Sequence, residues 1–530
     1  MSSMQGKAHI PVEIWHNCWK DLPLAGLLAL TQTCSLFRDI CRPILFRFFF
    51  YLPTAEAMVL TGNITSEDYD KWEKKAMRFE DRVKWLLVDP TFAILPRICM
   101  FSGMAEPDLY FLGIQYPNGP LVYKSMLSAF KASLTSMKSL RIIRLEDIDI
   151  DEEVLNALIQ LPLLKDVRLQ SPNITCHKFL PLLAVEELSI MEWDLRTEYI
   201  HQKLELFSNK RLKVIDIQSY QYAPPILEHF IAQGRSEFLT SLRISVDIKI
   251  VPILMAFFET CPQLTSLSAT STLPEFYPAY PALSSFALPN LCTYNGIGSL
   301  AAVLIPSRPV KRITILDNWC SAIHEGRPAS VLSQLVKSAA VIEHLSLPPL
   351  HPQPDLFHEI LRTFPKLKSL ELRFPLETDA AVEEMDNDST PDDEYFDLTT
   401  ANEIPPIEVD EEGSPIQPPT SMKGLLDWLC MNKLPLSPSI TNLAILQQNR
   451  RTRGINHMFK TCISFREQYR LAGMLSAHFP ALRSLTFGRQ HIQWVYGDDG
   501  KWTPGLEFAF YIEHRGKIPR IAPTARELAT

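Results

Sequence analysis

The sequence is poor in glycine and carries no excess of basic residues. Glycine accounts for 19 of the 530 residues and proline for 41. This balance disfavours enzymes built on glycine-rich phosphate loops and indicates many enforced helix ends. Lys and Arg number 52 against 60 Asp and Glu, which gives a formal net charge of −8. Because a phosphate backbone is attracted by a basic field, we expect no nucleic acid among the partners.

Long hydrophobic runs are also missing. No stretch approaches the roughly 18 uninterrupted apolar residues of a membrane-spanning helix, and residues 1–7 lack the apolar core of a signal peptide. The run Leu45–Leu52 is short and contains Arg47, so we interpret it as buried chain. The cysteines are scattered without a Cys-x-x-Cys pair, which is typical of reduced, mostly buried thiols. These absences predict a cytoplasmic or nuclear protein with no membrane partner.

No catalytic or metal-binding motif is found. The sequence contains no Gly-x-Ser-x-Gly, no His-Glu-x-x-His, no Walker loop and no metal-spaced Cys/His cluster. Histidines such as His177, His229 and His344 are scattered near apolar residues, where a satisfied structural histidine is the expected role. We therefore expect neither a metal nor a cofactor, and no enzyme activity of the chain itself.

The stretch from His9 to Phe50 has the pattern of short amphipathic helices. Pro11 suits a first helical turn, because its missing N–H has no helical partner there, and a second start follows at Pro23. Two apolar faces are spaced as on helices: Ile10, Ile14, Cys18 and Leu22, then Leu27, Leu30, Cys34 and Phe37. Helices this short cannot close a core alone. They form either a helical cap on the following chain or a docking module whose spare apolar face binds another protein.

At these residues the chain resembles the F-box, in particular the F-boxes of fungal proteins. The family pattern of an apolar residue, Pro, any residue, Glu and Ile or Leu is matched by residues 10–14, and the Leu-Pro before the second helix by residues 22–23. The chain departs from the family at Cys18, Thr33 and Phe37. The resemblance implies docking to the adaptor subunit of cullin–RING ubiquitin ligases, while the remaining chain holds a protein substrate. The adaptor-binding residues that it implies are Ile10, Pro11, Ile14, Leu22, Pro23, Leu27, Leu30, Cys34 and Phe37.

Beyond a capped, mixed-charge helix expected from Thr65, a six-residue pattern, apolar-x-x-apolar-x-apolar, recurs. Most copies are roughly 20 to 30 residues apart, the period of leucine-rich repeats. Several copies place a proline two residues before the hexad, as Pro162 stands before Leu164, and proline stops the preceding helix. Each unit is therefore predicted to be helix, proline stop, turn and strand; leucines clustered in an ordinary α/β domain are the alternative. The hexads begin at Leu140, Leu164, Val185, Leu212, Leu239, Leu264, Leu283, Val310, Ile342, Leu367, Ile440 and Leu482.

The outward positions of these strands are the predicted substrate surface. Arg144, Arg168 and Arg243 occupy the fifth position of their hexads, and we expect them in one row with Asp216, with Asp166 in the adjacent row. Arginine presents forked donors to carboxylates and phosphates, so an acidic or phosphorylated protein segment is the expected cargo. A solvated sheet face, or arginines covered by the chain's own acidic segment, are the alternatives.

Two later segments differ from the repeats. Residues 375–422 are rich in Asp, Glu and Pro and contain no Lys or Arg, so we predict a disordered insert. Near the C-terminal end, Asp498-Asp499-Gly500 predicts a hairpin turn after a strand at Ile492–Tyr496. The aromatic residues around that turn predict a cap on the last repeat, with an aromatic ligand site as the alternative.

Together these patterns predict an α/β protein in consecutive parts. The parts are a three-helix F-box at 1–52, a helical linker at 53–135, a leucine-rich-repeat-like solenoid with a parallel inner sheet and outer helices at 136–374, an acidic disordered insert at 375–422, and the last repeats with a C-terminal cap at 423–530. The expected function is that of a substrate-recognition subunit of a cullin–RING (SCF-type) ubiquitin ligase, docking the adaptor through the F-box and cargo through the repeats. The alternative is an F-box/leucine-rich-repeat scaffold that binds protein partners without directing ubiquitylation.

Overall fold

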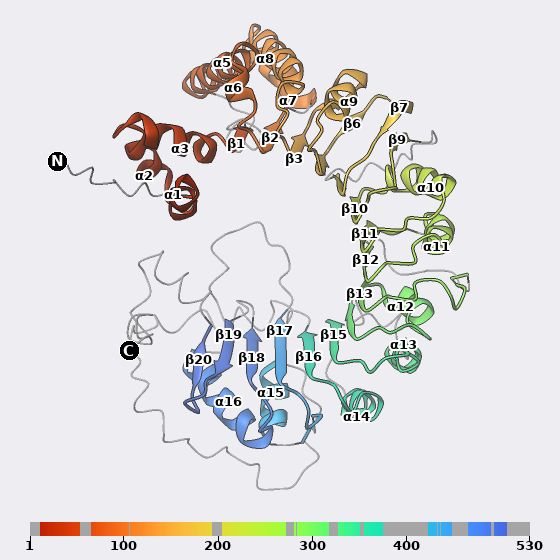
Figure 1. Cartoon of the computed structure of the whole chain (residues 1–530). Coiled ribbons are helices and arrows are strands. Elements are labelled where there is room, and N and C mark those ends of the chain that lie inside the picture. Colours follow the sequence, from red (N-terminus) through yellow and green to blue (C-terminus); the bar gives the residue numbers. More distant parts are fainter. Residues whose placement is uncertain are drawn as a thin grey trace, which may run out of the picture. The chain divides into compact units, whose positions relative to one another are not determined.

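The structure, a computed structural model, has the predicted mixed α/β architecture with a large parallel sheet (Figure 1). The chain divides into two compact units, Met1–Leu264 (unit 1) and Thr265–Thr530 (unit 2). The residues that the structure describes are 11–52, 65–104, 106–176, 178–192, 204–247, 249–271, 280–281, 283–316, 327–349, 354–374, 422–431, 433–434, 436–447, 465–488 and 492–505.

Unit 1 begins with the short helices α1 (Val12–Trp19), α2 (Leu24–Thr31) and α3 (Ser35–Leu45). Pro23 precedes α2 with an extended backbone, as the sequence predicts. At the start of α3, the Cys34 sulfur accepts a hydrogen bond from the Phe37 N–H at 3.4 Å. The helices enclose a small core, whose buried members are Trp19, Leu27, Ile40 and Cys41.

Unit 1 continues with a parallel sheet whose strands pair in chain order. They are β1 (Phe48–Tyr51), β2 (Ile98–Ser102), β3 (Ile142–Glu146), β5 (Asp166–Gln170), β8 (Glu187–Met191), β10 (Val214–Gln218) and β11 (Ser241–Ser245). Side chains alternate between the two faces along each strand. On β3, for example, Ile143 and Leu145 are buried and Arg144 is exposed. One face of the sheet therefore carries the core, and the other is called the outward face.

Helices cover the buried face of this sheet (Figure 1). They are α5 (Ser66–Val88), α6 (Pro90–Ala93), α7 (Glu106–Gln115), α8 (Gly119–Leu134), α9 (Glu152–Ile159), α10 (Ala223–Gln233) and α11 (Val251–Phe258). Two short parallel pairs complete the unit: β4 (Asp149–Ile150) with β6 (Asn173–Ile174), and β7 (Lys178–Leu183) with β9 (Glu205–Phe207). The helix predicted to begin at Thr65 is α5, and the Thr65 hydroxyl accepts a hydrogen bond from the Asp68 N–H at 3.2 Å.

One turn joins helices to the following strands and explains the recurring proline. The Leu164 N–H donates to the Leu161 carbonyl, with Pro162 at the second position of the turn, where its fixed φ is suitable. The same hydrogen bond joins Leu264 to Cys261, Leu367 to Phe364 and Leu482 to Phe479. The predicted order of helix, proline turn and strand is therefore confirmed at these repeats.

Unit 2 has the same construction. Its parallel strands are β12 (Ser266–Thr270), β13 (Thr293–Gly296), β14 (Arg312–Ile315), β15 (His344–Pro349), β16 (Ser369–Phe374), β17 (Asn442–Gln447) and β18 (Ser484–Gly488), and β19 (Ile492–Tyr496) and β20 (Trp502–Pro504) add to them antiparallel. Its helices are α12 (Gly298–Leu304), α13 (Arg327–Leu335), α14 (Pro354–Thr363), α15 (Met422–Cys430) and α16 (Phe465–His478). The predicted hairpin after Tyr496 is confirmed, and it buries Trp494 and Trp502.

The sheet begins earlier than the sequence predicts. β1 and β2 lie in the segments assigned to the N-terminal module and to the helical linker, and both pair in the parallel sheet. Their hexads start at Phe46 and Pro96 rather than at a leucine, valine or isoleucine. A search led by the leucine pattern therefore passes over them.

One predicted strand is wrong. The hexad from Leu283 to Leu288 forms no strand, because the chain turns there and Leu288 has a positive φ of 54°. The strand is β13, which follows Leu291. Its last position is Gly296, where a Cβ would come within 2.4 Å of a neighbouring carbonyl oxygen. The hexad of β13 runs from Leu291 to Gly296, and its last position carries a glycine instead of an apolar side chain. A search for apolar residues therefore misses it.

The predicted acidic insert at 375–422 lies outside the described residues, except for Met422, the first residue of α15.

Within the described ranges, no helix is long and apolar enough to cross a membrane. In the same ranges, no group of three or more His, Cys, Asp or Glu side chains is placed to hold a metal ion.

Candidate functional site

The helices α1 to α3 divide the predicted adaptor-binding residues between a core and an exposed face. Leu27 is only 5% exposed and belongs to the small core, against which Leu30 and Phe37 pack while partly buried. The burial of Leu27 corrects its assignment to the binding face, because periodicity gives the spacing of a stripe and not which stripe turns inward. Leu30 and Phe37 remain partly exposed, and their role in binding stays a prediction. Ile10 lies outside the described residues.

The other predicted residues of these helices are exposed. Pro11, Pro23 and Cys34 are exposed, Ile14 is 50% exposed, and Leu28, which the sequence analysis missed, is 48% exposed. The exposed large apolar residues, called the helical apolar face, are Val12, Ile14, Leu22, Leu24, Leu28 and Leu36. Sequence reasoning missed Leu24 and Leu28, because α2 is apolar on all sides and spacing alone does not single out its exposed positions. These exposed apolar side chains make the helices a candidate binding surface.

The predicted row of arginines exists on the outward face of unit 1. Arg144 of β3 is in register with Arg168 of β5, and Ser189, Asp216 and Arg243 follow on β8, β10 and β11. Adjacent strands lie about 4.8 Å apart, so neighbouring members of the row are within reach of one another. The shared register confirms the row that the hexad positions predict.

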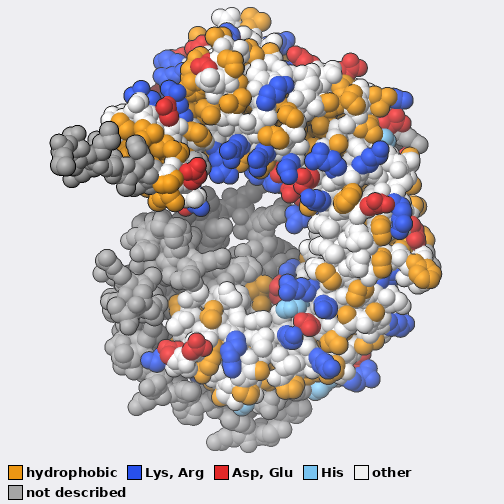
Figure 2. Space-filling model, in the orientation of Figure 1, with side chains coloured by type: hydrophobic (Ala, Val, Ile, Leu, Met, Phe, Trp, Pro, Cys, Tyr) orange, Lys and Arg blue, Asp and Glu red, His pale blue; other side chains and the backbone are white. Residues whose placement is uncertain are grey.

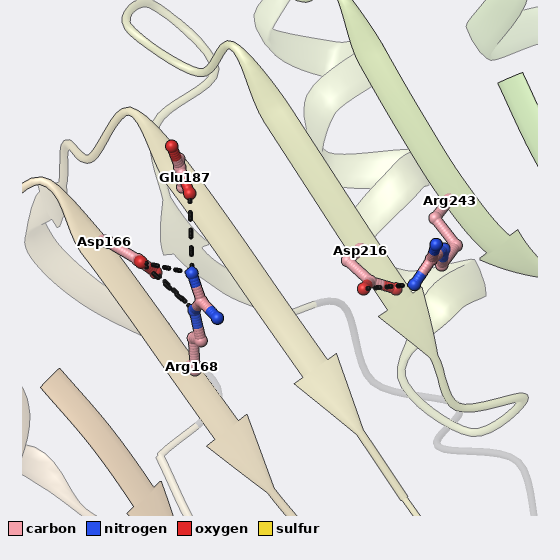
Figure 3. Close-up of polar contacts among 5 residues, drawn as sticks. All are labelled: Asp166, Arg168, Glu187, Asp216 and Arg243. Atoms are coloured by element: carbon pink, nitrogen blue, oxygen red, sulfur yellow. Dashed lines mark hydrogen bonds and ion pairs between the residues drawn. The ribbon is translucent and has the colours of Figure 1, made fainter. Parts of the chain in front are cut away.

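Arg168 is engaged by carboxylates of its own strand and of the next (Figure 3). Its Nε lies 3.1 Å from both carboxylate oxygens of Asp166, and its Nη2 lies 2.7 Å from Oδ2. The Glu187 carboxylate is 3.8 Å away. The hydrogen bonds to Asp166 raise the pKa of Arg168 above its ordinary value. Asp166 is only 5% exposed, which corrects its predicted role as a cargo contact, because Arg168 already satisfies its carboxylate.

Arg243 and Asp216 form a looser pair in the same row (Figure 3). Arg243 Nη1 lies 3.6 Å from the Asp216 Oδ2, and Gln218 Nε2 donates to Oδ1 at 3.0 Å. Arg144 differs, since it is exposed and makes no side-chain hydrogen bond or ion pair within the described ranges. The arginines of the row are therefore not equivalent, and Arg144 has the guanidinium most open to a ligand.

A second line of charges lies where the strands of unit 1 begin, and the sequence analysis missed it. There the Arg97 N–H donates to the Arg47 carbonyl at 2.9 Å, and the Arg141 N–H donates to the Arg97 carbonyl at 2.8 Å. The residues joined in this way, called the edge ladder, are Arg47, Arg97, Arg141, Lys165, Glu186 and Lys213. The available signal was a charged residue directly before each strand, a position that a search of the alternating outward sites skips.

Glu186 neutralises the half of the edge ladder that contains Lys165 and Lys213, called the far half. Its carboxylate oxygens lie 2.8 Å from Lys165 Nζ and 2.8 Å from Lys213 Nζ, and Arg211 is 3.7 Å away. Hydrogen bonds from the two lysines lower the pKa of Glu186 to about 2. The near half, formed by the arginines, has no such carboxylate among the described residues.

Comparison with known proteins assigns no family to this chain. No protein-family model matches the chain, and no curated protein matches it significantly in sequence. A functional proposal therefore depends on the helical apolar face, the outward face of unit 1 and the sequence pattern itself.

His229, Cys261 and Cys430 are buried, and their surroundings give them a structural role. His229 Nε2 lies 3.1 Å from the Phe207 carbonyl oxygen, which Gln233 Nε2 also contacts at 2.7 Å. This is the satisfied structural histidine that the sequence predicts. Burial raises the pKa of Cys261 and of Cys430 to about 12, which opposes formation of a reactive thiolate.

Proposed function

We propose that the chain is the substrate-recognition subunit of a cullin–RING (SCF-type) ubiquitin ligase, with an F-box followed by a leucine-rich-repeat-like solenoid. The observation that carries the proposal is the helical apolar face. Ile14 and Leu28 stay about half exposed although the same helices bury a core beneath them. Apolar side chains left at the surface favour a protein partner, and the resemblance of this segment to the F-box makes the ligase adaptor the expected one.

In this proposal the outward face of the sheet receives the cargo. The described helices that pack on the sheet of unit 1 cover its other face (Figure 1), and repeat proteins commonly bind partners on the face that their helices leave open. The outward face carries both charged and apolar side chains, which suits a protein segment. The expected compartment is the cytoplasm or the nucleus, because the described cysteines are free thiols. The chain recognises proteins and leaves the chemistry to the assembled ligase.

Co-precipitation of the adaptor tests the docking step. The double variant Ile14→Glu/Leu28→Glu places charge on the helical apolar face and leaves the core untouched. It is expected to abolish adaptor recovery, because an unpaired charge buried in an interface is unfavourable. Lys20→Glu, at an exposed polar position of the same module, is the matched control and should bind like the wild type. Equal recovery of the adaptor by the wild type and the double variant would contradict the proposal.

Association with a cullin separates a substrate receptor from a scaffold. A receptor is expected to co-purify with the cullin, and its captured cargo is expected to accumulate when the proteasome is inhibited. A chain that recovers the adaptor but never the cullin would favour the scaffold instead. The measurement is quantitative mass spectrometry of the purified complexes with and without proteasome inhibition.

A further inference from the structure

The first strands of the sheet expose aromatic side chains on their outward face. Phe48 and Phe50 of β1 are each 53% exposed, although both are large apolar residues. The parallel register continues these positions onto β2 and β3. It places Phe48, Ile98 and Ile142 in one row and Phe50, Met100 and Arg144 in the next. These two rows form an apolar strip, made of Phe48, Phe50, Ile98, Met100 and Ile142. Its second row ends at the exposed Arg144 of β3.

The near half of the edge ladder borders this apolar strip. Arg47, Arg97 and Arg141 are exposed and stand directly before β1, β2 and β3. The guanidinium of Arg47 lies 5.5 Å from the centre of the Phe48 ring, so charge and apolar surface are adjacent. In Figure 2 basic side chains gather along one margin of unit 1, with hydrophobic side chains beside them.

These arginines differ from every other described cation of the ladder. Lys165 and Lys213 share Glu186, whereas no carboxylate in the described part of the chain pairs with the arginines. Like charges on neighbouring strands repel one another. A bound anion would relieve this repulsion, and arginine offers it a planar fork of donors.

We propose that Arg47, Arg97, Arg141, Phe48, Phe50 and Met100 bind an acidic protein segment in which carboxylates are interspersed with aromatic or aliphatic side chains. The arginines pair with the carboxylates, and the apolar strip receives the hydrophobic side chains. Naming that segment the cargo rests on the function proposed above. The inference places the principal contact on β1 to β3, since Arg168 and Arg243 are already paired with carboxylates.

A single-stranded nucleic acid is the other ligand that arginines beside aromatic rings could bind. The neighbouring strands disfavour it. Glu187 and Asp216 continue the outward rows of the same sheet, so a phosphate backbone that extended past β5 would meet carboxylates. A short acidic peptide can end before them, and its hydrophobic side chains also use the apolar strip. Charge complementarity therefore favours the peptide.

Fluorescence anisotropy with the purified full chain tests the proposal. The probe is a labelled synthetic peptide, Gly-Asp-Phe-Glu-Asp-Leu-Asp-Phe-Gly. The double variant Arg97→Glu/Arg141→Glu is expected to weaken binding at least about tenfold, the effect of losing one charge-assisted contact. Phe50→Ser is expected to weaken it as well, through the apolar strip. Arg235→Glu, at an exposed arginine of unit 1 outside this surface, is the matched control and should bind like the wild type.

Three results would overturn the inference. They are equal affinity of the wild type and the double variant, equal binding of the same peptide with Lys in place of Asp and Glu, and tighter binding of single-stranded oligouridine. Circular dichroism checks folding, and Arg97→Gln/Arg141→Gln replaces the glutamate variant if the latter is unfolded. The assay contains neither adaptor nor cullin. Failure of peptide binding therefore leaves the docking test untouched, and failure of docking leaves the peptide result standing.

Discussion

The guanidinium of Arg168 folds back onto the carboxylate of Asp166, two residues earlier on the same strand, with Nη2 2.7 Å from Oδ2. Asp166 is buried while Arg168 remains partly exposed. The arginine side chain therefore covers the Asp166 carboxylate and supplies its hydrogen bonds. Arg144 occupies the same row and has no such carboxylate in the described chain. Two arginines at equivalent repeat positions therefore have different roles, one structural and one open to a ligand.

Removing the Arg168 guanidinium is expected to destabilise unit 1. Arg168→Met leaves the buried Asp166 carboxylate without its hydrogen bonds, which costs about 1–3 kcal/mol. Arg243→Met breaks a more exposed pair at 3.6 Å and should cost less than about 1 kcal/mol. Urea unfolding of both variants provides the comparison. The double variant Asp166→Asn/Arg168→Met should recover part of the loss, because it removes the uncompensated charge. Similar stabilities of the two single variants would show that Asp166 needs no partner.

Neighbouring leucines of α2 are expected to respond in opposite ways. Leu27→Ala opens a cavity in the small helical core and should cost about 2–5 kcal/mol. Leu28→Ala removes an exposed side chain and should change stability by less than about 0.5 kcal/mol, and it is expected to weaken the proposed binding of the adaptor. Amide hydrogen exchange of α1 to α3 reports the local stability. Faster exchange in the Leu28 variant than in the Leu27 variant would reverse the assignment of core and face.

The parallel strands and the register of the outward rows were predictable from the sequence because they follow from backbone geometry. Side chains on a strand alternate between faces, and a proline turn sets the same phase before several strands. Once the hexads at Leu140 and Leu164 are aligned, Arg144 and Arg168 must be neighbours. The α5 helix was predictable in the same way, from a cap at Thr65 and a continuous apolar spacing.

Side-chain partners were not predictable, because they depend on the fold around each residue. Leu27 and Leu28 are adjacent leucines on a helix that is apolar on all sides, and only the packing of the small helical core buries Leu27 and leaves Leu28 exposed. Asp166 and Arg168 both stand at outward positions, yet a rotamer choice turns one onto the other. The edge ladder depends on turns between strands, where the alternation rule no longer applies. Candidate sites that depend on unpaired charge therefore required the structure.

Unit 2 contains a buried arginine whose replacement should be severe. Arg308 donates to the backbone carbonyls of Ser284 and Leu304, both at 2.8 Å, and of Ala287 at 2.9 Å. Lysine cannot reproduce this fork of donors, so Arg308→Lys leaves buried carbonyls unsatisfied and should cost about 3 kcal/mol or more. Arg312→Lys, at an exposed position of β14, is the control and should behave like the wild type. Thermal unfolding measures both, and a small shift for Arg308→Lys would mean that another group satisfies these carbonyls.

The edge ladder makes part of the stability of unit 1 dependent on pH through Glu186. Its ordinary pKa of 4.5 is lowered to about 2 in the folded chain by hydrogen bonds from Lys165 and Lys213. Between these two values the unfolded state binds more protons than the folded state. The stabilisation is therefore complete above about pH 4.5 and is lost as the pH falls towards 2.

The variant Glu186→Gln isolates this contribution, because it keeps the shape of the side chain and removes its charge. At pH 7 it should be less stable than the wild type, since Lys165, Lys213 and Arg211 lose their shared carboxylate. At pH 3 the gap should narrow, because protonation of the unfolded wild type has already reduced its advantage. Glu237→Gln, at an exposed position with no ion pair in the described chain, is the control and should keep the same offset at both pH values. Urea midpoints at the two pH values provide the measurement. A gap for Glu186→Gln that is equal at pH 7 and pH 3, or wider at pH 3, would show that this carboxylate does not hold the lysines of the ladder.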